Sequence, residues 1–223
     1  MSGCPRMAKR RADNPCGVTT DAGISDIICV METAEGKVQS ASWRGPGMAA
    51  FDEYFMRMAL REAEKAAADG EVPAGCVIVE EPESDDVPPS AVRLLGRAHN
   101  QTEGLEDATA HAEMLALSAA FQARGSWRLT GTRLYVTKEP CPMCAGAIVL
   151  ARVNTVVWGV SDPKRGGGSV FGIFDHPGIN HHPALVEGVL ADESKAILQS
   201  FFRIRRASSG PSPKCENEGE ALR

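Results

Sequence analysis

The segment His111-Ala112-Glu113 and the later segment Pro140-Cys141-Pro142-Met143-Cys144 constrain the fold of this chain more than any other feature. One imidazole and two thiolates can hold a zinc ion on three sides and leave the fourth position open for chemistry, whereas structural zinc sites fill all four positions with protein ligands. We therefore expect His111, Cys141 and Cys144 to bind one catalytic zinc ion. The fold must then bring together two segments that lie far apart in the sequence.

The spacing of the two cysteines predicts how the thiols are presented. Cys141 and Cys144 are three residues apart, so a helix would place both on one face. Pro142 is favourable at the first position of a helix, and the positive helix end and a metal both favour the thiolate form. An isolated C-x-x-C pair could equally be a structural knot or two core cysteines. The additional His-x-Glu segment favours the catalytic site.

Glu113 is the predicted catalytic residue. His111 and Glu113 are two residues apart, about 200° around an ideal helix, so they are not expected to bind one ion side by side. We expect His111 to bind the metal and Glu113 to take a proton from a water molecule, deliver it to a ring nitrogen and help protonate a leaving amine. Alone, Glu113 would be an ordinary surface carboxylate. The combined pattern, however, resembles the signature of zinc deaminases that act on nucleobases.

Length, charge and cysteine usage limit the class of protein. The 223 residues are 43% hydrophobic, enough for a sizeable core, and they contain no apolar run long enough to span a membrane. The net charge of −5 excludes a wholly basic nucleic-acid binder but allows a local basic patch. The seven cysteines are odd in number and irregularly spaced, which argues against a disulfide framework and favours the reducing cytoplasm.

The pattern along the chain predicts one ordered α/β domain between two tails. Residues 1–48 lack sustained periodicity and are expected to be a poorly ordered extension, although translation beginning at Met48 is an alternative; residues 207–223 are expected to be a disordered tail. The acidic, proline-rich segment 80–89 is expected to be a solvated loop. Helices are predicted from Phe51 to about Gly70 and over 110–123 (with Thr109 as the N-cap), 142–151 and 192–206, and strands over 76–79, 92–98, 134–137, 153–160 and 186–190.

From residue 51 to residue 206 the chain resembles the bacterial tRNA-specific adenosine deaminases, the TadA family of the cytidine/deoxycytidylate deaminase superfamily. The zinc motif alone specifies only the superfamily, and the segments after it narrow the resemblance to the tRNA enzymes. The similar segments are Glu71-Val72-Pro73-Ala74-Gly75, Asn100, Thr109-Ala110-His111-Ala112-Glu113, residues 134–147, Trp158-Gly159-Val160-Ser161-Asp162-Pro163-Lys164, residues 176–181, residues 188–193, and Phe201-Phe202-Arg203-Ile204-Arg205-Arg206.

The resemblance implies a three-layer α/β/α cytidine deaminase-like fold for residues 49–206, with a central mixed five-stranded sheet flanked by helices. It implies a hydrolase acting on cyclic amidines that converts the wobble adenosine of tRNA to inosine, chiefly in the arginine tRNA with an ACG anticodon. Hydroxide on one Zn²⁺ per subunit would attack C6, with Glu113 as proton shuttle. The implied partners are a tRNA anticodon stem-loop and a second copy of the chain in a cytoplasmic homodimer. Bases splayed out of a single-stranded loop suit recognition by a protein.

The resemblance also implies substrate-binding residues. Asn100 corresponds to the amide that contacts the purine, although an asparagine in this position would also suit a turn. Asp162 and Lys164 lie in a segment near the substrate backbone, and Arg165 could add a phosphate contact. The end of the last helix could meet RNA through an aromatic ring and arginines while one phenylalanine packs in the core. The residues of that helix implied to bind RNA are Phe202, Arg203, Arg205 and Arg206.

Several alternatives remain open from the sequence. The same fold could deaminate a free base or nucleotide such as guanine or cytosine, or a riboflavin precursor, and a zinc-stabilised RNA-binding module without activity is a third possibility that the presence of Glu113 argues against. His176, His181 and His182 fit loop histidines near the nucleic acid or the dimer interface better than a second metal cluster, since they lack a recognisable ligand spacing. Ala108 stands where many family members have proline, which removes no chemistry.

Overall fold

A five-stranded sheet forms the centre of residues 46–208, the part of the chain that this computed structural model describes. The predicted extension over 1–48 and the predicted tail over 207–223 lie almost entirely outside these residues. The strands are β1 (Gly75–Glu80), β2 (Leu94–His99), β3 (Thr132–Lys138), β4 (Thr155–Val160) and β5 (Ala184–Val186), and the helices are α1 (Pro46–Ala68), the short 3-10 helix η1 (Pro89–Ala91), α2 (Ala112–Arg124), α3 (Pro142–Ala151) and α4 (Ala191–Ser208).

The sheet is mixed, as predicted. Its strand order is β2-β1-β3-β4-β5, with β1 antiparallel to both of its neighbours and β3, β4 and β5 parallel to one another. The parallel pair β3 and β4 is joined by α3, because parallel neighbours need a crossover connection. As a consequence, the carboxyl ends of β2, β3 and β4 lie along one edge of the sheet.

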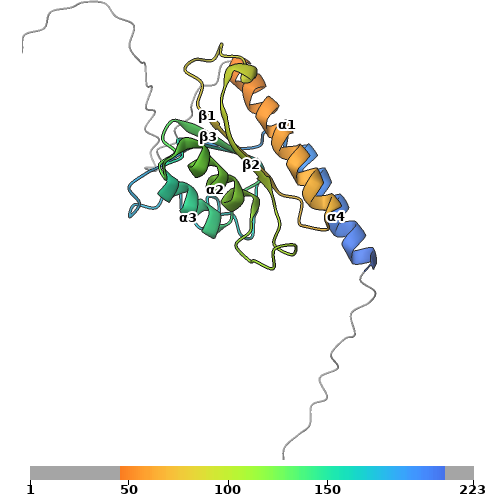
Figure 1. The fold of residues 1–223 in the computed structure, drawn as a ribbon. Coiled ribbons are helices and arrows are strands. Elements are labelled where there is room, and N and C mark those ends of the chain that lie inside the picture. Colours follow the sequence, from red (N-terminus) through yellow and green to blue (C-terminus); the bar gives the residue numbers. More distant parts are fainter. Residues whose placement is uncertain (1–45, 209–223) are drawn as a thin grey trace, which may run out of the picture. The chain divides into compact units, whose positions relative to one another are not determined.

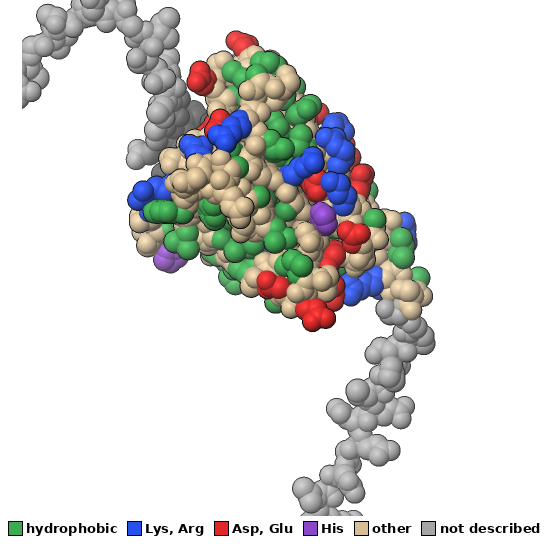
Figure 2. Space-filling model, in the orientation of Figure 1, with side chains coloured by type: hydrophobic (Ala, Val, Ile, Leu, Met, Phe, Trp, Pro, Cys, Tyr) green, Lys and Arg blue, Asp and Glu red, His purple; other side chains and the backbone are tan. Residues whose placement is uncertain are grey.

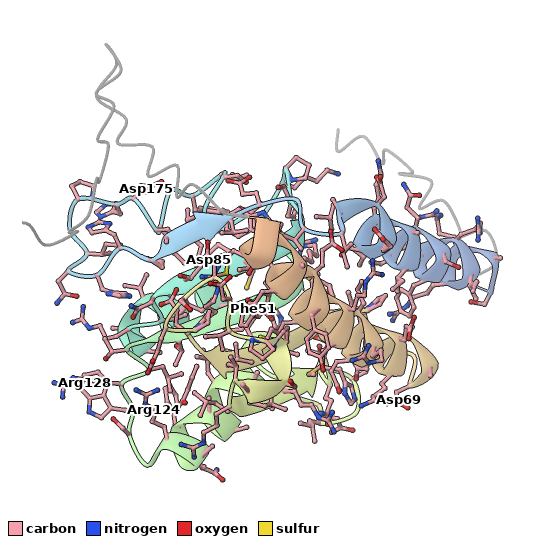
Figure 3. All side chains as sticks on the ribbon, turned by 90° about the horizontal axis from the view of Figure 1, so that it is seen from above. Phe51, Asp69, Asp85, Arg124, Arg128 and Asp175 are labelled. Carbon is pink, nitrogen blue, oxygen red and sulfur yellow. The ribbon has the colours of Figure 1, made fainter. Side chains whose placement is uncertain are left out.

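Helices cover both faces of the sheet, which confirms the three-layer arrangement (Figure 1). Alternate residues of β1 point to opposite faces. Cys76 and Ile78 belong to the core under α2 and α3, whereas Val77 and Val79 belong to the core under α1. The strand is therefore apolar on both faces, which is typical of a buried strand. Viewed from above, Arg124 at the end of α2 and Arg128 just after it lie on the side of the sheet away from α4 (Figure 3).

Three predicted elements differ from the structure. The first helix begins at Pro46 rather than Phe51, and it buries Met48 in the core under α1. Thr109 is not the N-cap of α2: His111 occupies that position, and Thr109 instead bonds to Asp107 through its backbone N–H and its hydroxyl. The last strand is Ala184–Val186, shorter and earlier than predicted.

No residue of the acidic segment 80–89 is buried, as expected, but its first residues are anchored. Glu81 accepts hydrogen bonds from Arg133 at 3.0 Å and from Thr155 at 2.8 Å. Arg133 also pairs with the fully buried carboxylate of Asp52, which accepts a hydrogen bond from the hydroxyl of Tyr135. This buried polar cluster fastens the start of α1 to β3. Within residues 46–208, none of the helices has the length and apolar character that crossing a membrane requires.

Candidate metal centre and active site

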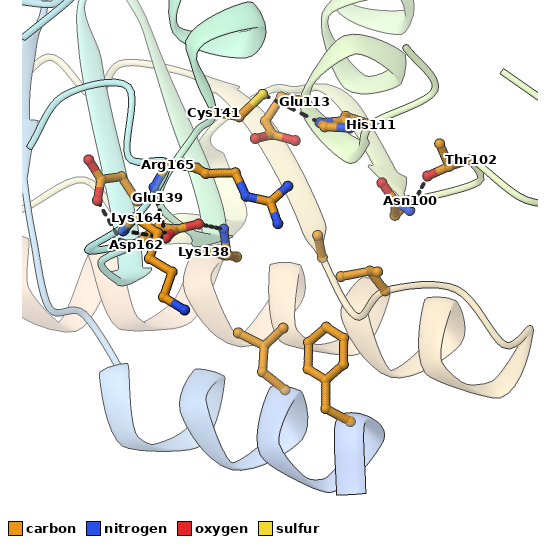
Figure 4. Close-up of a pocket in the computed structure, with 14 residues that line it drawn as sticks. Asn100, Thr102, His111, Glu113, Lys138, Glu139, Cys141, Asp162, Lys164 and Arg165 are labelled. Atoms are coloured by element: carbon orange, nitrogen blue, oxygen red, sulfur yellow. Dashed lines mark hydrogen bonds and ion pairs between the residues drawn. The ribbon is translucent and has the colours of Figure 1, made fainter. Parts of the chain in front are cut away.

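A cavity of about 390 Å³ opens at the edge of the sheet where β2, β3 and β4 end. Its size lies in the range of small-molecule sites. The lining comes from five parts of the fold: the turn before β1, the segment from β2 into α2, the end of β3, the loop after β4, and α4 (Figure 4). Residues that bear charge or can bind metal dominate it, among them His111, Glu113, Lys138, Glu139, Cys141, Asp162, Lys164 and Arg165.

His111, Cys141 and Cys144 meet at the N-termini of two helices. His111 is the N-cap of α2, Cys141 is the N-cap of α3, and Cys144 lies one turn further along α3. The Nδ1 atom of His111 lies 3.6 Å from Sγ of Cys141 and 3.5 Å from Sγ of Cys144, and the two sulfurs are 3.7 Å apart. Among the described residues, this is the cluster of at least three His, Cys, Asp or Glu side chains that could hold a metal ion.

These separations fit tetrahedral zinc. Bond lengths of about 2.3 Å to sulfur and about 2.0 Å to nitrogen, at tetrahedral angles, require sulfurs about 3.8 Å apart and nitrogen about 3.6 Å from each sulfur. The observed values agree within about 0.1 Å. Three protein ligands would leave one position of a tetrahedral ion open, as in catalytic rather than structural sites, and two of the three, His111 and Cys141, line the cavity.

The electrostatics of the cluster favour a cation. The hydrogen bond with Cys144 and the one with His111 lower the pKa of the Cys141 thiol to about 3, although burial raises it. The same hydrogen bond between the sulfurs raises the pKa of Cys144, with burial acting in the same direction. One thiol is therefore ionised at the expense of the other, and a divalent ion would stabilise both as thiolates.

Glu113 points into the cavity beside His111 and Cys141 (Figure 4). Only 4% of the residue is exposed, and burial raises the pKa of its carboxyl group above the ordinary value. The angular separation of 200° does not apply here, because His111 precedes α2 in extended conformation and only Glu113 lies within the helix. Both side chains can therefore face one point, with Glu113 placed to exchange protons there.

Asn100 is held by a buried carboxylate. Its side-chain nitrogen donates to Oε2 of Glu71 at 3.1 Å and to the hydroxyl of Thr102 at 2.6 Å. Glu71 is 3% exposed and also accepts the backbone N–H groups of Glu103 and Gly104, both at 2.8 Å. With both amide hydrogens engaged, the carbonyl oxygen of Asn100 remains for a ligand in the cavity.

Asp162 and Lys164 line the cavity too, but Asp162 is engaged within its own loop. It forms an ion pair with Lys138 and accepts the backbone N–H groups of Lys164 at 2.9 Å and Arg165 at 3.1 Å. Although burial raises the pKa of Asp162, these hydrogen bonds lower it to about 2. Glu71, Thr102, Lys138 and Glu139 were given no role from the sequence.

The end of α4 reaches the cavity at a single predicted residue. Phe202 lines the cavity and is 40% exposed, whereas Arg203, Arg205 and Arg206 lie on the exposed end of the helix outside the cavity lining. The prediction that one phenylalanine packs in the core is wrong. Phe201 is only half-buried, and it lies against Phe202 and under the guanidinium group of Arg205.

The histidines after β4 form no metal cluster within the described part of the chain. His181 bonds to the carbonyl oxygen of Val153 at 2.6 Å, and His182 bonds to that of Phe174 at 2.9 Å. His176 accepts the backbone N–H of Gly178. Their contacts are those of residues that hold a loop in place, as the sequence favoured.

Residues 49–160 match the family described as the cytidine and deoxycytidylate deaminase zinc-binding region. A tRNA-specific adenosine deaminase of Bacillus subtilis is 46% identical over 153 residues, which cover 68% of this chain and 89% of that protein. The chain belongs to the tRNA-specific adenosine deaminase family. A second member, from Aquifex aeolicus, is 43% identical over 68% of this chain and 93% of its own length.

The fold of this deaminase is also similar to that of a solved structure. It comes from a study of A-to-I editing by tRNA:A34 deaminases at the wobble position of transfer RNA, and it is 40% identical, with a TM-score of 0.59 over 65% of this chain and 99% of that chain. The predicted family and fold are confirmed. The predicted zinc cofactor is confirmed as well, because the matching region is zinc-binding and the His/Cys/Cys group suits that ion.

Proposed function

We propose that this protein is a zinc-dependent hydrolase that deaminates adenosine to inosine in tRNA. The observation that carries the proposal is the cluster of His111, Cys141 and Cys144 at tetrahedral zinc spacing, beside the buried carboxylate of Glu113 in a cavity of about 390 Å³. Relatives that are 43–46% identical and bear the name of this activity support the substrate class.

His111, Cys141 and Cys144 would hold the zinc ion. Zinc, when bound, would act as a Lewis acid and lower the pKa of a water in its open position to about 7. Glu113 accepts the proton of the attacking water and delivers it to N1 of the purine. It then takes the remaining proton from the hydroxyl group now on C6 and delivers it to the amine that leaves, so that adenosine and water give inosine and ammonia. Its buried position raises its pKa and favours this exchange.

Asn100 is proposed to recognise the purine edge. Its amide is fixed by Glu71 and Thr102, so the carbonyl oxygen is presented to the cavity in one orientation. A pre-oriented amide discriminates between bases more sharply than a mobile one, since an unmatched base would leave a buried polar group without a partner. Asp162 is proposed to act mainly by holding the loop that carries Lys164.

The nucleic acid is proposed to be the anticodon stem-loop, with the wobble adenosine of the arginine tRNA with an ACG anticodon as the chief target. The exposed end of α4 supports this, because Phe202 can stack on a base next to the cavity and Arg203, Arg205 and Arg206 can meet phosphates beyond it. Lys164 lines the same cavity as Phe202 and could bind a further part of the backbone. A tRNA substrate would place the enzyme in the cytoplasm.

A homodimer is proposed from the surface over α2 and α3. Apolar side chains gather over this part of the molecule in the space-filling view (Figure 2). Leu150 of α3 is 74% exposed, and Trp127, which lines the same surface pocket, is about half exposed. Large exposed apolar groups in one region are typical of protein–protein interfaces. Leu150→Glu should place a charge in that interface and give a monomer in solution mass measurements.

The proposal is tested with an anticodon stem-loop that contains a wobble adenosine. The purified protein should form inosine from it, and free adenosine and free guanine should run beside it as competing substrates. Glu113→Ala should keep zinc and RNA binding but lose turnover by at least about 100-fold, the usual contribution of a general acid–base residue. Glu64→Ala, which removes an exposed carboxylate from α1, is the matched control. Deamination of guanine without any inosine in RNA would favour a free-base enzyme.

A further inference from the structure

One side of the cavity carries positive charge that the described residues do not neutralise. Lys138 is paired with Asp162 there. Lys164 and Arg165 also line the cavity, yet neither side chain forms an ion pair with any carboxylate in residues 46–208. Arg165 extends from its loop into the cavity, toward the side that carries Glu113 (Figure 4). These two cationic side chains have no ion-pair partner among the described residues and can therefore pair with an anion in the bound ligand.

The loop that carries Arg165 is built on a buried carboxylate. Glu139 is 2% exposed and accepts three hydrogen bonds from the loop. Its Oε2 atom accepts the backbone N–H of Asp162 at 2.8 Å and the hydroxyl of Ser169 at 2.9 Å, and its Oε1 atom accepts the backbone N–H of Ser169 at 2.8 Å. Both ends of the segment 162–169 are therefore tied to one side chain, and Arg165 lies between them.

The loop packs closely on Glu139 at its centre, Gly166. A Cβ atom at Gly166 would overlap both carboxylate oxygens of Glu139. Only glycine permits this approach, so the backbone next to Arg165 is fixed by direct contact with Glu139. The position of the Arg165 side chain thus depends on a group that the proposed deamination step does not use.

We propose that Arg165 binds a backbone phosphate next to the edited nucleotide, and that Glu139 is the residue that positions it. The inference rests on the proposed function, since a phosphate is the anion that an RNA substrate brings and a free base lacks. Arg165 would therefore contribute to the selection of polynucleotides over free bases. A guanidinium group suits this role because its planar set of donors can bind two phosphate oxygens at once.

The salt dependence of RNA binding tests the role of Arg165. Each phosphate contact on a single strand contributes about 0.7 to the slope of log Kd against log salt. Arg165→Ala should lower the slope for the stem-loop by about 0.7, which corresponds to about fivefold weaker binding at 0.1 M salt and almost no difference at 1 M. Arg93→Ala is the matched control, because Arg93 is exposed and precedes β2 at the end opposite to Asn100.

If Glu139 positions Arg165, a change at Glu139 should alter RNA binding only by altering the contact that Arg165 makes. Glu139→Gln places an N–H donor among three donors, so the loop should shift and the salt slope should fall as it does in Arg165→Ala. The double variant should lose no more than Arg165→Ala alone, since two changes on one path are not additive. If Glu139→Gln does not fold, Ser169→Ala removes one of the three hydrogen bonds and should lower the slope by a smaller amount.

The outcomes separate this inference from the proposed function. A salt slope that Arg165→Ala leaves unchanged would overturn the inference, whether or not the wild-type protein forms inosine. Additive losses in the double variant, or an unchanged slope in the Glu139→Gln and Ser169→Ala variants, would overturn the positioning role. Failure of the wild-type protein to form inosine from the stem-loop would overturn the proposed function instead.

Discussion

Replacing Asp52 by alanine should destabilise the fold far more than replacing its neighbour Glu53. Asp52 is completely buried, pairs with Arg133 at 3.2 Å and accepts the hydroxyl of Tyr135 at 2.9 Å. Its removal leaves a cation and a hydroxyl buried with fewer partners, and breaking a buried ion pair typically costs about 3–5 kcal/mol. Because Arg133 keeps its second partner, Glu81, we expect the lower limit of about 3 kcal/mol.

Thermal unfolding followed by circular dichroism measures this loss. In a domain of this size, about 3 kcal/mol corresponds to a fall in Tm of roughly 6–12 °C. Glu53→Ala removes an exposed i, i+4 pair with Arg57, which is worth about 0.3–0.5 kcal/mol, so its Tm should move by less than about 2 °C. Equal small shifts of Tm in both variants would refute the reasoning, since Glu81 and solvent would then be enough to stabilise the buried charge of Arg133 without Asp52.

Three further predictions follow from the site and the packing. Cys144→Ser should reduce the zinc content measured by elemental analysis well below one ion per chain and abolish inosine formation; full activity without zinc would contradict the metal assignment. Lys138→Met should raise the pKa of Asp162 from about 2 toward its ordinary value, which carbon-detected NMR titration measures. In the wild-type protein, the pKa of Asp162 is lower in the folded state than in the unfolded state. Asp162 should therefore stabilise its loop at neutral pH, and this stabilisation should be lost as the pH falls toward 2. Gly75→Ala should lower stability in denaturant by at least about 1 kcal/mol, because its Cβ atom would overlap the carbonyl oxygen of Ala59.

Local patterns in the sequence were enough to predict the helices that present the metal ligands. The helix predicted over 142–151 agrees with α3 residue for residue, because Pro142 defines its start. The start of α1 was less predictable: Gly47 weakens a helix in isolation, and the burial of Met48 against the sheet makes the first turn stable. Tertiary packing overrides propensity in such a case.

The metal ligands and Glu113 could be predicted because the spacing of a few side chains determines their chemistry. Glu71 and Glu139 could not, because their roles arise from contacts between segments about 20–40 residues apart, such as that between Glu71 and Glu103. A buried carboxylate surrounded by backbone N–H groups leaves no periodic signal in a sequence. The position of Glu139 directly before Pro140-Cys141 was the one local indication that it lies at the site.

That position has a consequence for how the two halves of the site are coupled. Cys141 would hold the metal, and Glu139, two residues earlier at the end of β3, holds the loop that carries Arg165. The distance between the metal and the proposed phosphate contact is therefore set by a short, rigid length of backbone that includes Pro140 and is anchored in the centre of the sheet. A rigid link of this kind keeps a bound nucleotide in register with Glu113, since a shift of about 1 Å at the reacting atoms would slow the reaction strongly.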